Sequence, residues 1–426
     1  MVRFRSAAAG CVVVALTFSG SGLSSGPSSS ASATAATASA EPMPTSARAP
    51  AGAAIKVGFI CSCSGPQASL LADTAKVARA WADSVNASGG INGHPVKLFT
   101  FDDGQIASRG LQDAKALVQQ DHVIAIVGEY SQVDGEWVPW VVSHGVPVVG
   151  GSSGDPVQGT SSGVFPSGST FLALTVGTIA EAKGKQSLGV MYCAETPACA
   201  QFVPLATAVG KLFGLKVTAT SISATAPSYA APCLTFKGAD VNALFVADNG
   251  SIVQRVVADC SQQGYRPLEV TEEAAATSAM LKDSQLAGTL AAGTDADPLD
   301  SSLPAVREFR EALAKYYPGL LNSAGFTQDD FYPWVGGKLF EAAAKAADIG
   351  PASTPAELKA GLYSLKNDTL GGIAPPLTYT RGKPYFSPCW FSARIEKGTL
   401  ISLHGNRPVC LSANQAAALA KALHLG

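Results

Sequence analysis

The sequence has little charge of either sign, and this shortage excludes several kinds of partner. Charged residues make up 15% of the 426 residues, and the 30 basic and 32 acidic side chains leave a formal net charge of −2. A chain without a basic excess does not attract nucleic acid, and no block of like charges indicates an interaction tail. Long apolar runs are also missing: residues 7–18 form an apolar run, but a membrane-spanning helix needs roughly 20 residues. We therefore expect no nucleic-acid partner and no membrane-spanning segment.

The sequence also lacks the common catalytic and cofactor motifs. It contains no phosphate-binding G-x-x-x-x-G-K-[ST], no H-E-x-x-H and no dinucleotide-binding G-x-G-x-x-G between a strand and a helix. Residues 150–154 do satisfy the G-x-S-x-G pattern, with Ser152 as the nucleophile. A nucleophile elbow must lead into a helix, however, and the turn-rich segment 155–169 follows, with only His404 and His424 downstream. We therefore expect no catalytic residue, no cofactor and no metal ligand.

The N-terminal region has the composition of an export signal. Arg3 and Arg5 precede the apolar run, as in a signal peptide. Residues 19–54 are almost entirely Ser, Ala, Gly, Thr and Pro, which cannot bury enough surface to fold. Cleavage fits either the A-x-A pattern at 38–40 or a site nearer the apolar run. The apolar core follows Cys11 instead of preceding it, so the pattern does not favour a lipid anchor. We expect an exported protein.

Eight cysteines follow this signal, and an even number in an exported chain indicates disulfides. The pairs closest in sequence are Cys193 with Cys199, Cys233 with Cys260, and Cys389 with Cys410. Cys61 and Cys63 then remain, either joined in a very tight ring or left as two free thiols. A zinc site at these two cysteines lacks a second ligand pair nearby.

From residue 55 onward, apolar strands alternate with amphipathic helices. The pattern predicts strands at 55–60, 96–101, 123–127 and 146–149, with helices at 70–87, 108–120 and 137–143. Such strands are typical of a parallel sheet that helices cover on both faces. A break at 150–171 precedes a second set of strands and helices. The sequence therefore predicts an α/β fold with two similar lobes.

The C-terminal part of the chain has a different pattern. It predicts three helices, at 303–316, 330–347 and 354–365, followed by strands at 377–380 and 389–396. The sequence Arg-Gly-Lys-Pro at 381–384 offers a turn that would join these two strands as a hairpin.

Residues 89–104 carry the most specific pattern in the chain. The segment Gly-Gly-Ile-Asn-Gly-His-Pro-Val-Lys-Leu-Phe-Thr-Phe-Asp-Asp-Gly turns the chain back into an alternating strand that ends on two carboxylates. A Ser-Gly-Pro turn at 64–66 precedes the intervening helix. With these features in this order, the chain resembles the leucine/isoleucine/valine-type solute-binding proteins, a branch of the type I periplasmic binding proteins.

This resemblance implies two parallel-sheet α/β lobes joined by a three-segment hinge, with crossings near 168–172, 288–294 and 371–375. The predicted division is a signal peptide and Ser/Ala-rich leader (1–40), a disordered linker (41–54), lobe 1 (55–170 plus 291–372) and lobe 2 (171–290 plus 373–426).

Ligands of open α/β sheets bind outside the carboxyl ends of the strands, so the loops at those ends are the candidate binding loops. Two loops of the first lobe, 128–132 and 150–155, offer hydroxyls and backbone N–H groups that suit an anionic group. The resemblance implies that Ser131, Ser152 and Ser153 hold a ligand carboxylate there. A solvated Ser/Gly turn is the structural alternative for both loops.

Three further candidates lie outside these two loops, Asn249 and Glu272 in the second lobe and Tyr332 in the first. Asn249 follows a predicted strand, while the resemblance implies that Glu272 pairs with a ligand ammonium and that Tyr332 forms an aromatic wall. An acid at a helix N-terminus and an aromatic core residue are the structural alternatives. Gln132 follows Ser131 where the family usually has a longer hydroxyl run, so the ligand class stays open among amino acids, small organic acids and amides.

These features predict an exported, monomeric solute-binding protein. It would close on a small polar organic ligand, without a cofactor, and deliver the ligand to the permease of an ABC importer. A ligand-sensing receptor of the same fold that does not transport is one alternative, and a serine hydrolase using Ser152 is the other.

Overall fold

The computed structural model describes residues 52–65, 68–151, 157–195, 197–323 and 325–423. The chain forms two units, Met1–Ser46 and Ala47–Gly426, and all of the described residues belong to the second. The predicted signal peptide and leader, most of the predicted linker, and Ser152 and Ser153 lie outside the described residues. Within the described ranges, no helix has both the length and the apolar character needed to cross a bilayer.

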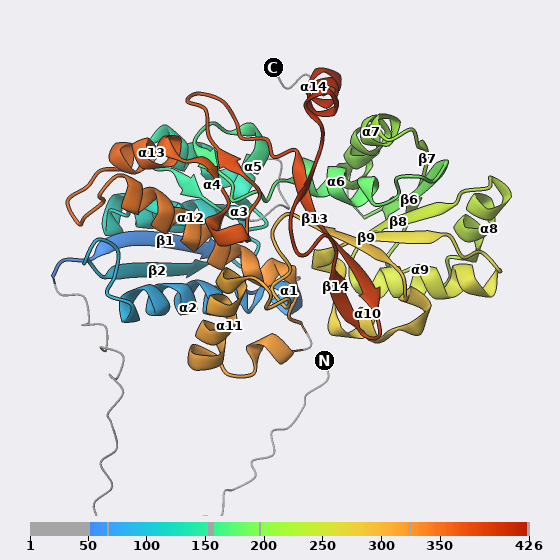
Figure 1. The fold of residues 1–426 in the computed structure, drawn as a ribbon, viewed down its shortest axis with the longest axis horizontal. Coiled ribbons are helices and arrows are strands. Elements are labelled where there is room, and N and C mark those ends of the chain that lie inside the picture. Colours follow the sequence, from blue (N-terminus) through green and yellow to red (C-terminus); the bar gives the residue numbers. More distant parts are fainter. Residues whose placement is uncertain (1–51, 66–67, 152–156, 196, 324, 424–426) are drawn as a thin grey trace, which may run out of the picture. The chain divides into compact units, whose positions relative to one another are not determined.

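The first sheet has five parallel strands in the order β2-β1-β3-β4-β5 (Figure 1). The strands are β1 (Ile55–Cys61), β2 (Val96–Asp102), β3 (Ala125–Val127), β4 (Val148–Val149) and β5 (Val164–Phe165). Alternate side chains of β1 face opposite layers of helices. Val57 packs into the core formed with α2 (Thr74–Ala87), α11 (Pro304–Tyr316), α12 (Tyr332–Ala346) and α13 (Pro355–Ser364), whereas Ile60 faces α3 (Ala107–Ala116) and α4 (Asp134–Ser143).

The second sheet is mixed, with the strand order β14-β13-β10-β9-β8-β6-β7 and β15 paired to β13. The parallel strands are β6 (Ser187–Cys193), β7 (Lys216–Ile222), β8 (Ala243–Ala247), β9 (Leu268–Glu272) and β10 (Leu290–Gly293). The antiparallel strands are β13 (Cys389–Glu396), β14 (Thr399–Ser402) and β15 (Val409–Cys410). Two α/β sheets were predicted, and both are present, although the second adds these antiparallel strands at one edge.

Helices cover both faces of the second sheet as well. One face packs against α6 (Phe171–Ala180), α7 (Pro197–Leu212) and α14 (Ala413–Ala422), and the other against α8 (Ala230–Gly238), α9 (Gly250–Gln262) and α10 (Ser278–Lys282). The remaining short elements are α1 (Ala68–Leu71), α5 (Val157–Thr160), β11 (Lys366–Asp368) and β12 (Leu377–Thr378).

The predicted hairpin between 377–380 and 389–396 is wrong. β12 pairs with β11, whereas β13 pairs with β10, β14 and β15. The segment between β12 and β13 carries Tyr379 and Tyr385, which are buried in the core of the first sheet, and the Tyr379 hydroxyl donates to the Pro166 carbonyl oxygen at 2.6 Å. Packing of these two rings keeps β12 with the first sheet and leaves β13 to complete the second.

Segments that follow β5, follow β10 and precede β12 lie against one another. Gly168 has a φ of 120°, and a Cβ there would lie 2.5 Å from the Pro375 ring and 3.1 Å from the Thr294 carbonyl oxygen. The Ala296 N–H donates to the Ile373 carbonyl oxygen at 3.0 Å. Segments near the three crossings implied by the family resemblance are thus in contact, and the crossings themselves stay a prediction.

The glycine-rich reversal before β2 is fixed to the end of α12 by hydrogen bonds. Asn92 adopts a φ of 50°, and its side-chain amide donates to the carbonyl oxygens of Ala344 (3.2 Å) and Ile349 (3.0 Å) at the end of α12. At the other end of β2, the Asp102 carboxylate accepts the Ser64 N–H at 3.0 Å. The residues that carry the family resemblance therefore hold the first lobe together.

Three disulfides are present among the described side chains. They join Cys61 to Cys63, Cys233 to Cys260, and Cys389 to Cys410. The two longer local pairings are confirmed, and the open choice at Cys61 and Cys63 is decided in favour of a bond. The side chain of Cys199 lies outside the description, so its pairing with Cys193 stays a prediction.

Candidate functional site

The candidate binding loops follow the carboxyl ends of parallel strands in both sheets. In the first sheet the predicted loops follow β3 and β4, and in the second they follow β8 and β9. This edge of an α/β sheet is where ligands bind, because the strand ends and helix starts leave backbone N–H groups and side chains facing outward. Each predicted residue can therefore be examined at this edge.

A buried carboxylate, that of Asp103, connects the loops after β1, β2 and β3 through hydrogen bonds. Asp103 accepts hydrogen bonds from the hydroxyls of Ser62 (2.7 Å) and Ser131 (2.6 Å) and from the Gln105 N–H (2.8 Å). The Ser131 hydroxyl in turn accepts the indole N–H of Trp137 at 3.1 Å. Because this hydroxyl already donates its proton to Asp103, a ligand contact from Ser131 requires the network to rearrange. The role of Ser131 as a ligand contact stays a prediction.

Two stacked tyrosines join the loop after β3 to the start of α12. The rings of Tyr130 and Tyr332 have centroids 6.0 Å apart and planes inclined by 15°, and both residues are buried. The Thr294 hydroxyl donates to the Tyr332 hydroxyl at 3.3 Å. Tyr332, which the sequence indicated as an aromatic wall, therefore sits beside a connection between the sheets, and Tyr130 extends the same aromatic surface.

Two half-buried carboxyls from different parts of the chain influence each other. Glu272 is the last residue of β9, and Asp329 lies in the short helical turn Gln328–Phe331 before α12. Burial, and next the charge of Asp329, raise the pKa of Glu272 to about 7. Burial raises the pKa of Asp329 to about 6, and a hydrogen bond with Tyr130 offsets part of this shift. We call Glu272 and Asp329 the acidic pair.

The acidic pair has no basic counterpart in the described structure. None of the ion pairs among the described residues includes Glu272 or Asp329. Two desolvated carboxyls, one of which raises the pKa of the other, form an electrostatically unsatisfied position. A cationic group placed between them would favour the ionised form of both.

A further hydrogen bond ties the end of β9 to the turn before α12. The Gln328 amide donates to the Glu273 carboxylate at 2.6 Å and to the Asp295 carbonyl oxygen at 2.9 Å. Gly293 permits this approach, because a Cβ there would lie 2.2 Å from the amide nitrogen of Gln328. Burial raises the pKa of both Glu273 and Asp295 well above the ordinary range, so burial favours the neutral form of these two carboxyls.

Asn249 has a structural role at the same edge. It is exposed and caps α9, where its side-chain oxygen accepts the N–H groups of Ser251 (3.1 Å) and Ile252 (3.3 Å). The start of α9 packs closely on the turn after β9, since a Cβ on Gly250 would lie 2.3 Å from the Ala275 carbonyl oxygen. Asn249 and Glu272 therefore occupy neighbouring loops, although the amide of Asn249 is already engaged.

Sequence reasoning did not single out Asp329 or Tyr130. Two acids, Asp329 and Asp330, stand at the start of the predicted helix, and the capping box uses only one of them: the Thr327 N–H donates to Asp330 at 3.1 Å. Asp329 is the acid that the capping box does not use, and this second acid was the sequence feature that could have indicated a functional role. Tyr130 lay inside a predicted binding loop, but hydroxyls were favoured over the aromatic ring there. Among the described residues, no group of His, Cys, Asp and Glu side chains is arranged to hold a metal ion.

Comparison with solved structures shows the same fold in several proteins. A branched chain amino acid ABC transporter from Thermus thermophilus with bound valine has a TM-score of 0.72 and 12% identity, covering 87% of this chain and 99% of that one. A fatty acid ABC transporter substrate-binding protein from Thermomonospora curvata has a TM-score of 0.66 and 17% identity, covering 88% and 95%. A substrate-binding periplasmic protein from Ralstonia solanacearum has a TM-score of 0.65 and 21% identity, covering 82% and 99%.

At these identities, the structural likeness establishes the fold alone. No curated protein matches the sequence. The family model described as "periplasmic binding protein" matches residues 54–399, which include the first sheet and all of the second apart from β15 and most of β14. The chain therefore belongs to the type I periplasmic binding proteins.

Proposed function

We propose that this protein is an exported solute-binding protein that captures a small polar organic ligand bearing an ammonium group and delivers it to an ABC importer. Membership of the periplasmic binding proteins supports the binding role. Solved proteins of the same fold include ABC transporter components described with valine and with fatty acids, so the fold accommodates ligands with and without an ammonium group. The choice between these ligand classes rests on the residues of this chain.

The proposal of a ligand with an ammonium group rests on the acidic pair. An ammonium between Glu272 and Asp329 supplies the positive charge that both carboxyls lack, and desolvated carboxylates gain most from a charged hydrogen-bond donor. Tyr130 hydrogen-bonds Asp329 and stacks on Tyr332, so aromatic surface adjoins the acidic group. An aromatic face also attracts a cation. A ligand whose only charge is a carboxylate meets repulsion here instead.

The same residues explain how a ligand would favour closure of the lobes. Glu272 belongs to the second sheet, whereas Asp329 and Tyr332 belong to the segment that packs on the first. A ligand that contacts both groups binds more tightly when they are near each other, and this difference in affinity shifts the hinge towards the closed form. The predicted contacts from Ser131, Ser152 and Ser153 would hold the anionic end of the ligand.

A sensor that binds the same ligand without passing it to a permease is the second candidate. The acidic pair supports binding in either case, and the permease partner and monomeric state remain part of the proposal. Co-purification with a membrane permease encoded beside this protein would favour transport over sensing.

The test of the ligand class compares molecules with the same skeleton. Valine and 3-methylbutanoate differ by the ammonium group, and similar pairs exist for other amino acids. Because any ligand of the native state raises apparent stability, a thermal-shift screen of the mature protein should show stabilisation by amino acids and none by the matched acids. Stabilisation by the matched acids alone would overturn the proposal.

Variants then assign the effect to the acidic pair. Glu272→Gln and Asp329→Asn should each weaken the identified amino acid by about 10- to 100-fold, the worth of a hydrogen bond to a charged group. Glu195→Gln is the matched control, because Glu195 is an exposed acid after β6 that bonds the Ser223 hydroxyl and the Ala224 N–H. Equal affinities in all three variants would place the ammonium elsewhere.

A further inference from the structure

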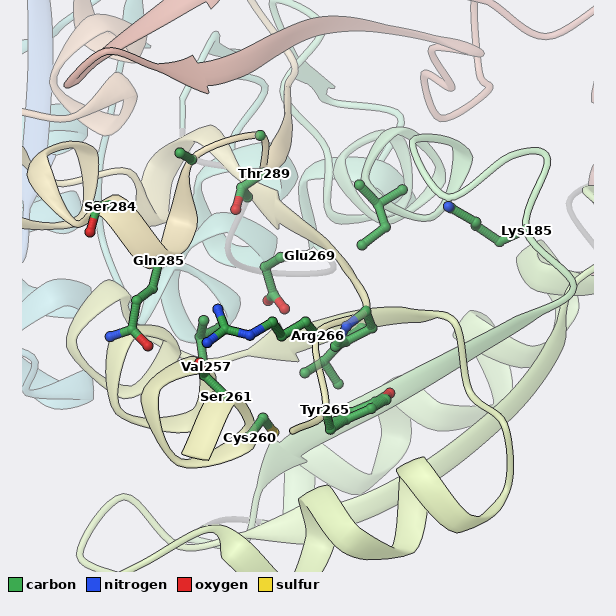
Figure 2. Close-up of a pocket in the computed structure, with 15 residues that line it drawn as sticks. Lys185, Val257, Cys260, Ser261, Tyr265, Arg266, Glu269, Ser284, Gln285 and Thr289 are labelled. Atoms are coloured by element: carbon green, nitrogen blue, oxygen red, sulfur yellow. The ribbon is translucent and has the colours of Figure 1, made fainter. Parts of the chain in front are cut away.

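A pocket lies at the end of the second sheet that is opposite to the acidic pair. It is formed where β8, β9 and β10 begin, and its volume is about 520 Å³. Its walls also include the last turns of α9 and the short turn Ser284–Leu286. Figure 2 shows the side chains of Glu269, Arg266, Gln285 and Lys185 around this space. The size is within the range of small-molecule sites, roughly 300–1,000 Å³.

A buried carboxyl without a partner lines this pocket. Glu269, the second residue of β9, is 6% exposed, and neither of its side-chain oxygens accepts a hydrogen bond. Its backbone neighbour Val270 faces the opposite core, so the alternation of the strand directs Glu269 to the α9 side. Burial raises the pKa of Glu269 well above the ordinary range, and the Val246 N–H offsets part of that shift without meeting hydrogen-bond geometry.

A second unsatisfied group faces the same space. Tyr265 is also 6% exposed, and its hydroxyl has no hydrogen-bond partner. Burial, and next the charge of Glu269, raise its pKa, which indicates that the hydroxyl and the carboxyl are near each other. Buried polar groups in folded proteins nearly always have partners, because a buried group that makes no hydrogen bond has lost its contact with water without compensation. Two such groups lining one pocket indicate that something polar occupies it.

The mouth of the pocket has the opposite charge. Lys185 and Arg266 line it and are exposed, and neither forms an ion pair with a described residue. Apolar side chains, including Leu244 and Val257, form part of the wall. The pocket is therefore acidic at a buried point, apolar along its wall and basic at its mouth.

We propose that this pocket binds a small zwitterionic aminocarboxylate, whose ammonium group donates to Glu269 and Tyr265 and whose carboxylate pairs with Lys185 and Arg266. A simple amine satisfies the buried end but meets two cations at the mouth. A simple acid satisfies the mouth but brings a like charge towards Glu269. A molecule with an ammonium at one end and a carboxylate at the other matches both, with its methylene groups along the apolar wall.

This site belongs to the second sheet alone, so its occupancy does not depend on closure of the lobes or on the proposed ammonium site at Glu272. The probes are the linear aminocarboxylates from β-alanine to 6-aminohexanoate, with n-butylamine and butanoate as single-charge controls. Hydrogen–deuterium exchange locates binding, because a ligand in this pocket should slow exchange in residues 257–269 and 284–289. Calorimetry on the same samples gives the affinity.

At least one aminocarboxylate should bind saturably, protect those two segments and bind at least tenfold more tightly than either single-charge control. Glu269→Gln should weaken that binding at least tenfold. The double variant Lys185→Gln/Arg266→Gln alters only exposed side chains and should weaken the aminocarboxylate at least tenfold, while n-butylamine should bind at least as tightly as it binds the wild type. Lys183→Gln, a nearby exposed lysine that does not line the pocket, should change neither.

Three results would overturn the proposal. Absence of protection by every member of the series would leave water as the partner of Glu269 and Tyr265. Undiminished protection in both Glu269→Gln and the double variant would place the probe elsewhere. Loss of protection in Glu272→Gln, with full protection retained in Glu269→Gln, would show that the probe binds at the acidic pair and not in this pocket.

Discussion

Replacing Glu272 by Gln should stabilise the ligand-free protein at and above neutral pH, although the same change weakens ligand binding. Glu272 has a folded-state pKa of about 7 against a reference value of 4.5. Its folded form therefore keeps a proton that the unfolded chain has already released. Wherever the native state binds more protons than the unfolded state, stability falls as pH rises. Glutamine has nearly the same shape and is always neutral, so the variant does not lose stability in this way as the pH rises.

The size of the effect follows from the shift. At about 1.4 kcal/mol for each pKa unit, Glu272 lowers the free energy of unfolding by about 3 kcal/mol as the pH rises from below 4.5 to above 7. The variant Asp329→Asn removes the neighbouring charge and should restore part of this lost free energy of unfolding, because Asp329 is the second cause of the raised pKa of Glu272. Most of the difference between wild type and Glu272→Gln should thus appear between pH 5 and pH 8.

Urea unfolding of the ligand-free proteins at pH 5 and pH 8 measures this directly. The stability of Glu272→Gln relative to wild type should rise by about 3 kcal/mol between the two pH values. The control Glu195→Gln should show almost no change between these pH values, because the Ala224 N–H, followed by the Ser223 hydroxyl, lowers the pKa of Glu195, and this carboxyl is largely ionised at both. A relative stability of Glu272→Gln that is the same at both pH values, or lower at pH 8, would refute the reasoning.

Three further outcomes follow from the structure. The affinity of the wild type for an ammonium ligand should fall at least tenfold between pH 8 and pH 5, because the acidic pair becomes protonated. Its affinity for a neutral ligand should stay the same over this range, and calorimetry at both pH values measures the two affinities. Asp103→Ala should lower the free energy of unfolding in urea by about 3 kcal/mol, since the Ser62 and Ser131 hydroxyls lose their shared acceptor. The double variant Cys233→Ala/Cys260→Ala should lose about 3.5 kcal/mol, the loop-closure value for its separation of 27 residues, and a loss below 1 kcal/mol would contradict that account.

The fold could be predicted from the sequence wherever short-range patterns specify it. Apolar strands alternating with amphipathic helices gave the two α/β sheets, and sequence proximity gave the disulfide pairs Cys233–Cys260 and Cys389–Cys410. The hairpin prediction failed because the partners of β12 and β13 were chosen by long-range packing. Burial of Tyr379 in the first core outweighed the turn signal at residues 381–384.

The site was less accessible to sequence reasoning. Glu272 was indicated by resemblance to a family, but its interaction with Asp329 depends on a segment that returns to β9 from far along the chain. Asn249 and Ser131 have the right chemistry in the right loops, yet local hydrogen bonds to the α9 backbone and to Asp103 use their polar atoms. A sequence pattern identifies which polar groups are present, whereas only the fold shows which of them are already satisfied.

The described disulfides have a consequence for how the chain matures. Each one joins two cysteines that are consecutive along the chain, with separations of 2, 27 and 21 residues. A chain that enters an oxidising compartment N-terminus first exposes each such pair before the next pair arrives. The bond formed earliest between available thiols is then also the native bond. Correct oxidation in such a chain would depend little on a disulfide isomerase, whereas refolding of the full-length reduced chain would present all the thiols at once and allow wrong pairings.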